Sequence, residues 1–205
     1  MRYKLEGSVM PAVEVLLNRG ESIYTQTGGM CWMSDGISMS TNARGGFMRG
    51  LGRMFSGESF FMTSYQAEMD GAMVAFSSTV PGEIVPVDLR EYRGFYCQKG
   101  SFLCAESAVE TKVAFTKKVS SGFFGGEGFI MQKLSGQGTA FLEFDGSVIE
   151  YNLQPGQQIV IDTGYLAAME ATCSMEIKTV PGIKNMVFGG EGCSTLSSQD
   201  RGAYG

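Results

Sequence analysis

The most informative stretch of the chain is residues 139–148, which read TAFLEFDGSV. The run of apolar, aromatic and β-branched residues up to Phe144 is typical of a β-strand, and the Asp-Gly pair after it is typical of a turn. Similar strand-like runs occur at 73–76, 159–161 and 175–180, bounded by Gly, Pro, Asp or Asn. No window carries a long helical stripe. The sequence therefore predicts an all-β fold, as a sandwich or barrel.

The same landmarks occur three times along the chain. The first is a turn glycine followed by an apolar strand, at 20–23, 81–84 and 155–159. The second is a glycine followed by a hydrophobic run, at Gly29, Gly100 and Gly164. A Gly-Glu pair comes 26–28 residues later, and a further glycine then opens a strand, at Gly71, Gly138 and Gly202. Three ordered matches at nearly equal spacing predict an internal repeat.

We expect one compact unit over residues 1–205 that holds three β-sandwich repeats, at about 9–79, 80–153 and 154–205. The third copy stops at its last strand. Residues 5–9 (LEGSV) resemble residues 144–148 (FDGSV), so the N-terminal strand 2–5 is expected to close the third repeat and to protect its edge. A C-terminus shortened or altered relative to related chains is the alternative.

Four motifs resemble an uncharacterised bacterial and archaeal family related to the mitochondrial biogenesis protein named for altered inheritance of mitochondria. They are GESFF at 57–61, GGEGF at 125–129, GGEG at 189–192 and SGQGTAFL at 135–142. The resemblance implies a fold similar to the trp RNA-binding attenuation protein, with short double-stranded β-helix repeats around a pseudo-threefold axis. It implies no activity and no catalytic residues. The ending SSQDR at 197–201 departs from the family pattern.

Composition narrows the function classes. The chain has a net charge of −5, which does not favour nucleic acid as a partner. It has no run of about 18 apolar residues, so we expect no transmembrane segment, and no signal-like start, so we expect a cytoplasmic protein. The chain has no histidine and five cysteines without CxxC spacing. We therefore expect no cofactor and no metal, and we interpret the cysteines as reduced and mostly buried.

Three carboxylates occupy equivalent positions in the repeats: Glu58, Glu127 and Glu191. If the copies surround an axis, these carboxylates could converge into a cation or acid–base site. The favoured alternative is that each one accepts hydrogen bonds from backbone N–H groups in its own glycine-rich turn.

One stretch is basic and glycine-rich, and it contains Arg44, Arg49 and Arg53. Such a loop could bind a phosphate or lipid headgroup. The favoured alternative is a surface connection that covers one end of the core. Methionines in strand-like runs are interpreted as core filling: Met33, Met39, Met62, Met73 and Met131.

The sequence assigns no specific function and no catalytic residue. The leading hypothesis is a non-enzymatic interaction or assembly module that forms a homo-oligomer, because β-repeats leave edges and flat faces. The alternative is a protein that binds a small molecule, anion or lipid headgroup in an inter-repeat groove or at the basic loop.

Overall fold

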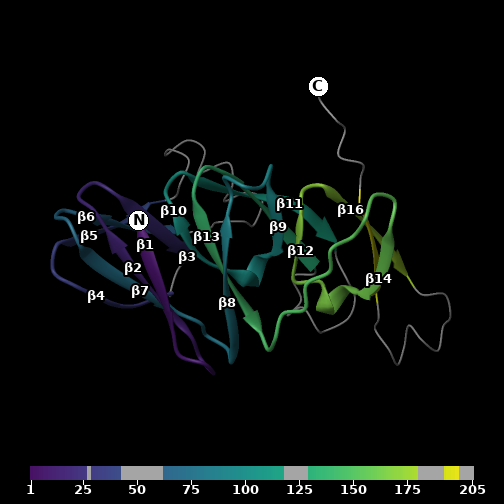
Figure 1. The fold of residues 1–205 in the computed structure, drawn as a ribbon, viewed down its shortest axis with the longest axis horizontal. Coiled ribbons are helices and arrows are strands. Elements are labelled where there is room, and N and C mark those ends of the chain that lie inside the picture. Colours follow the sequence, from purple (N-terminus) through teal and green to yellow (C-terminus); the bar gives the residue numbers. More distant parts are fainter. Residues whose placement is uncertain (27–28, 43–61, 118–128, 180–191, 199–205) are drawn as a thin grey trace. The chain divides into compact units, whose positions relative to one another are not determined.

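The computed structural model describes residues 1–26, 29–42, 62–117, 129–179 and 192–198. These residues form strands β1 to β17, with two short 3-10 turns, η1 (Lys99–Ser101) and η3 (Thr163–Tyr165). Figure 1 shows strands throughout the described part. The predicted all-β fold is confirmed.

The chain divides into two compact units. Unit 1 comprises Met1–Asp88, Phe102–Val109 and Gln137–Val148, and unit 2 comprises Leu89–Ser101, Glu110–Gly136 and Ile149–Gly205. The chain passes between the units five times. The segment predicted as the second repeat, 80–153, contributes strands to both units.

Unit 1 contains two sheets. The first has the order β1-β2-β7-β4, with β1 (Arg2–Glu6), β2 (Ala12–Leu17), β7 (Ala72–Ser77) and β4 (Met30–Met33). The second has the order β5-β6-β3-β10-β13-β8, with β5 (Ile37–Asn42), β6 (Met62–Ala67), β3 (Ser22–Gln26), β10 (Phe102–Glu106), β13 (Thr139–Asp145) and β8 (Gly82–Asp88). The strand pairs are antiparallel.

The core of unit 1 follows from the alternation of side chains along its strands. In β2, Val13, Val15 and Leu17 are buried, whereas Leu16 on the opposite face is exposed. Buried residues of both sheets meet in one cluster that includes Phe141 of β13. Burial of this apolar area is the main favourable term for folding of the unit.

Unit 2 has a four-stranded and a three-stranded sheet. The first has the order β11-β12-β9-β15, with β11 (Val109–Lys117), β12 (Phe129–Gly136), β9 (Phe95–Gln98) and β15 (Ala168–Glu170). The second has the order β14-β17-β16, with β14 (Gln158–Asp162), β17 (Gly192–Ser198) and β16 (Cys173–Thr179). Among its described residues, a buried cluster centres on Phe129, Met131 and Leu166.

The N-terminal strand pairs with its neighbour in the chain. β1 pairs with β2, from Arg2↔Leu16 to Glu6↔Ala12, within unit 1. The expected pairing with the third repeat is not found in the described residues, where β17 lies between β14 and β16. The connection from β1 to β2 is short, and Gly7 adopts a positive φ of 86° there. A short hairpin loop costs little closure entropy, which favours the local partner.

A common strand order recurs in the sheets. The order β2-β7-β4 matches β8-β13-β10, and the order β5-β6-β3 matches β11-β12-β9 and β16-β17-β14. Gly71 and Gly138 precede β7 and β13, as expected from the landmarks. The turn glycine before an apolar strand does not mark equivalent strands in all three copies. Residues 20–23 and 155–159 lead into β3 and its counterpart β14, whereas residues 81–84 lead into β8, the counterpart of β2. The Gly-Glu pairs and Gly202 lie outside the described residues.

Candidate functional site

The predicted site residues lie outside the described part of the chain. This holds for the three carboxylates and for the three arginines of the basic loop: Glu58, Glu127, Glu191, Arg44, Arg49 and Arg53. The carboxylate cluster and the basic phosphate site therefore stay predictions. A candidate site must be built from the residues that the structure describes.

Two of the described carboxylates accept hydrogen bonds from nearby loops. Glu143 accepts hydrogen bonds from the backbone N–H of Thr79 (2.8 Å) and the hydroxyl of Ser78 (3.0 Å). Glu21 accepts from the backbone N–H of Asn18 and from the N-terminal amine, and these interactions lower its pKa. Among the described residues, no group of three or more Cys, Asp or Glu is placed to hold a metal ion. These carboxylates fix loops.

Four cysteines are free thiols that differ in how far they are buried. Cys97 and Cys104 are buried, whereas Cys31 is exposed and Cys173 is half-buried. Burial raises the pKa of the Cys97 thiol to about 12 and raises the pKa of Cys104 as well. Because only the thiolate is a good nucleophile, both buried sulfurs are inert at neutral pH. The expectation of mostly buried cysteines holds for these two.

Alkylation should separate these thiols. In the native protein at pH 8, we expect iodoacetamide to label Cys31, while Cys97 and Cys104 stay unlabelled until denaturant is added. Both burial and a raised pKa slow the reaction of the two buried groups. Peptide mass spectrometry after timed labelling measures this. Rapid labelling of Cys104 in native protein would contradict its position in the core.

The open edges of the sheets remain as candidate interaction sites. In the described part the edge strands are β1, β4, β5, β8, β11, β14, β15 and β16. Natural proteins protect such edges with charges, proline or short length. Several edges here carry these features: β1 has Arg2, Lys4 and Glu6, β8 has Pro86, β11 has Glu110 and Lys112, β16 has Glu176, and β15 has three residues. Strand β5 is mostly Ser, Thr and Asn.

Strand β4 is a short edge strand without charge or proline. Its sequence MCWM has no charge, and its neighbour in the sheet is β7. Trp32 is 43% exposed and Met33 is 42% exposed. The prediction that Met33 and Met39 fill the core is therefore wrong, since Met39 is 56% exposed as well. The same prediction is confirmed for Met62 and Met131, which are buried. Strand alternation alone could not separate these two groups, because it does not show which strands lie at an edge.

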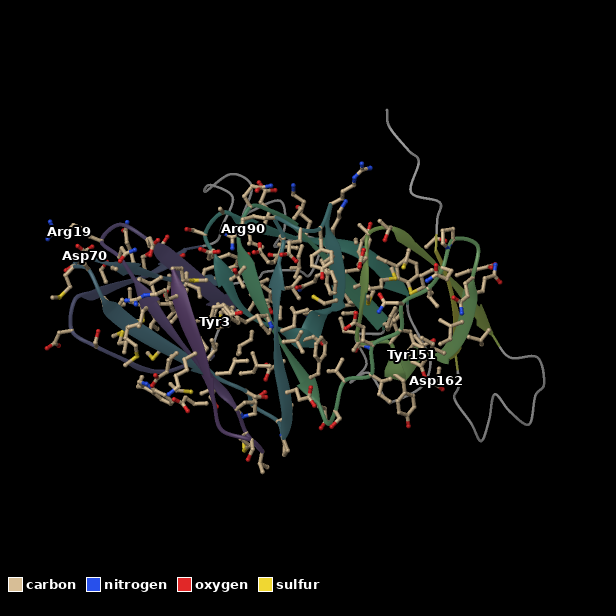
Figure 2. All side chains as sticks on the ribbon, in the orientation of Figure 1. Tyr3, Arg19, Asp70, Arg90, Tyr151 and Asp162 are labelled. Carbon is tan, nitrogen blue, oxygen red and sulfur yellow. The ribbon has the colours of Figure 1, made fainter. Side chains whose placement is uncertain are left out.

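Strand β14 is an edge strand whose one charged residue, Asp162, stands at its end. Ile159 and Ile161 pack on the core of unit 2, whereas Val160 between them is 65% exposed. Asp162 ends the strand (Figure 2) and accepts a hydrogen bond from the backbone N–H of Gly164, 2.7 Å away. Tyr165 follows in η3 and is also largely exposed. The central part of this edge is therefore apolar and uncharged.

The described residues form sheets of short antiparallel strands with exposed edges, which defines an all-β protein. None of the helices in the described residues is long and apolar enough to cross a membrane. The chain belongs to the mitochondrial biogenesis AIM24 family, whose model matches residues 3–200. This confirms the resemblance inferred from the sequence.

Two relatives are from Streptococcus pyogenes. An uncharacterised protein of the serotype M6 strain is 30% identical over 202 residues, covering 94% of this chain and 79% of the relative. A crystal structure of a protein from the same species is similar in fold, with a TM-score of 0.76 and 25% identity, over 97% of this chain and 89% of that one. Neither the family description nor these relatives name a reaction or ligand, so no specific function is derivable from them.

Proposed function

We propose that this protein is a non-enzymatic assembly module whose copies associate through unprotected strand edges. The observation that carries the proposal is that β4 ends its sheet without charge or proline and that β14 carries a charge only at its last residue, Asp162, while several other edge strands carry charges within the strand or a proline. Exposed Trp32, Met33 and Val160 add apolar area to these edges, which favours association.

A non-enzymatic role agrees with the chemistry of the described polar groups. Glu21 and Glu143 are held by turns, and the buried thiols of Cys97 and Cys104 stay protonated. Free cysteines also suit a reducing compartment such as the cytoplasm. We place the protein there as part of the same proposal.

The module is built, in this proposal, from three repeats around a pseudo-threefold axis. The strand order β5-β6-β3 recurs as β11-β12-β9 and β16-β17-β14, which supports three copies of one sheet. The order β2-β7-β4 recurs as β8-β13-β10. Repetition multiplies similar edges, and similar edges favour homo-oligomers.

The mass of the protein in solution tests the assembly function. We expect sedimentation velocity and light scattering to give species heavier than the 22.1 kDa of one chain, with the heavier fraction growing as concentration rises. Edge-to-edge association follows mass action, so dilution should reverse it. A mass of one chain at every concentration would contradict the proposed function.

A further inference from the structure

Three Asp-Gly pairs lie in turns of unit 1, and they differ in how their atoms are held. The pairs are Asp35-Gly36, Asp70-Gly71 and Asp145-Gly146. Each aspartate is exposed, and the three glycines have nearly the same positive φ, at 79°, 76° and 74°. Glycine adopts this conformation at little cost, so the pair is well suited to such turns. The three turns therefore offer a comparison within one unit of the protein.

An Asp-Gly pair can rearrange its own backbone. The glycine nitrogen attacks Cγ of the aspartic acid, an N–Cγ bond forms, and the carboxyl hydroxyl leaves as water with the proton that the nitrogen loses. Water then opens the five-membered imide. When it breaks the bond between the main-chain carbonyl carbon and the glycine nitrogen, the chain afterwards runs through Cγ as isoaspartate. Glycine favours the reaction because it has no Cβ to obstruct the approach.

The reaction is slowed when the glycine N–H or the carboxylate is held by a hydrogen bond, as in the turn at Asp70-Gly71. The N–H of Gly71 donates to the carbonyl of Leu17 at 2.9 Å. The carboxylate of Asp70 accepts a hydrogen bond from the backbone N–H of Arg19 at 2.8 Å, and Figure 2 shows the two residues together. Both reacting groups of this turn are therefore engaged.

The glycine nitrogen is also held in the turn at Asp145-Gly146. The N–H of Gly146 donates to the carbonyl of Pro81 at 3.0 Å, and both residues belong to unit 1. This hydrogen bond has to open before the nitrogen can turn toward Asp145. Opening costs free energy, because the N–H loses its partner.

The turn at Asp35-Gly36, between β4 and β5, leaves both reacting groups unengaged. Within the residues that the structure describes, the N–H of Gly36 donates no hydrogen bond and the carboxylate of Asp35 accepts none. The neighbouring groups nevertheless fix the turn. The N–H of Ser34 donates to the carbonyl of Met73, and the N–H of Glu68 donates to the carbonyl of Gly36, both at 2.8 Å.

We propose that Asp35 is a site of spontaneous isomerisation, where the folded protein forms isoaspartate in preference to Asp70 and Asp145. The inference goes beyond the proposed assembly function and does not depend on it. Isoaspartate adds one atom to the main chain at the turn that joins the two sheets of unit 1, since β4 belongs to the first sheet and β5 to the second.

Ageing of the purified chain tests the site. Native protein is kept for weeks in neutral buffer at physiological temperature and digested, and the isomeric peptides are separated and identified by electron-transfer fragmentation. We expect isoaspartate to form at Asp35 at least about five times faster than at Asp145 or Asp70, which corresponds to the roughly 1 kcal/mol that a backbone hydrogen bond contributes. The same chain in urea is the control, because without its turns the three pairs should convert at similar rates.

Two results would overturn the inference. The first is equal conversion at the three pairs in folded protein, or faster conversion at Asp145 or Asp70, because the hydrogen bonds would then not control the reaction. The second is an intact Asp35 in folded protein over the time in which the urea sample converts. The sedimentation measurement of the assembly function is independent of either result.

A pair of variants keeps the test decisive if the native reaction is slow. Asp35→Asn and Asp145→Asn each replace the leaving water by ammonia, which leaves more readily, and loss of the amide is visible as a change in peptide mass. We expect the Asp35→Asn protein to lose its amide at least about five times faster than Asp145→Asn while folded. Equal rates in the two folded variants would rule out a preference for the turn at Asp35-Gly36. Asp35→Glu should abolish conversion at this turn, because the longer side chain would have to close a six-membered ring.

Discussion

Replacing Phe141 by alanine is expected to lower the free energy of unfolding of unit 1 by about 3–5 kcal/mol. Phe141 lies in β13 and is fully buried in the core cluster that both sheets of the unit form. Its ring meets the Tyr3 ring edge-on, with centroids 5.0 Å apart. Alanine would remove the ring from this contact and leave a cavity that the strands on either side, β8 and β10, cannot close without losing their register.

Urea denaturation measures this loss. Trp32 is the one tryptophan of the chain and lies in unit 1, so its fluorescence reports on that unit, and circular dichroism follows the whole chain. Leu16→Ala is the control, because Leu16 lies on the exposed face of β2 in the same unit and should cost about 1 kcal/mol or less. Equal midpoints for the two variants would contradict the central position of Phe141.

The strands themselves could be predicted from local pattern. The run 139–144 is confirmed as β13, and the glycines at 71 and 138 do open β7 and β13. Alternation with period two and turn residues act within a few positions along the chain, so they are visible in a single sequence. The family resemblance, carried by motifs of the same short range, is confirmed over residues 3–200.

The order of the strands could not be predicted, because pairing depends on contacts far apart in sequence. The comparison of repeats did not predict that β1 pairs with β2, or that residues 80–153 contribute strands to two units. Met33 and Met131 both lie in strand-like runs, yet one is exposed at an edge and the other is buried. The difference is set by the sheet position, which the period-two pattern does not encode.

The candidate site illustrates the same limit. The sequence highlighted charged residues in glycine-rich loops, whereas the structure draws attention to two largely apolar strands, β4 and β14, that have the composition of core segments. Their significance arises only when the strand orders are compared and each is found at the end of a sheet. An apolar edge strand and a central strand have the same composition, so composition could not have identified them.

Replacing Gly82 by alanine is expected to destabilise unit 1 by about 3 kcal/mol or more. Gly82 begins β8 opposite Asp145 at the end of β13. A Cβ atom added at Gly82 would overlap the carbonyl oxygen of Phe144 and would lie 2.8 Å from the backbone nitrogen of Gly146. These are backbone atoms, so no side-chain rotation can relieve the overlap, and the β8–β13 pair must open at this end.

The opening would also break contacts on the other side of Gly82. Its N–H donates to the carbonyl of Val9 at 2.9 Å, and Gly146 donates to the carbonyl of Pro81 at 3.0 Å. Gly100→Ala is the matched control, because a Cβ there meets nothing within 4 Å and should change stability by less than about 1 kcal/mol. Thermal denaturation followed by circular dichroism compares the two variants. A Gly82→Ala protein as stable as Gly100→Ala would mean that β8 does not approach β13 this closely, because a backbone overlap of this kind cannot be absorbed without separating the strands.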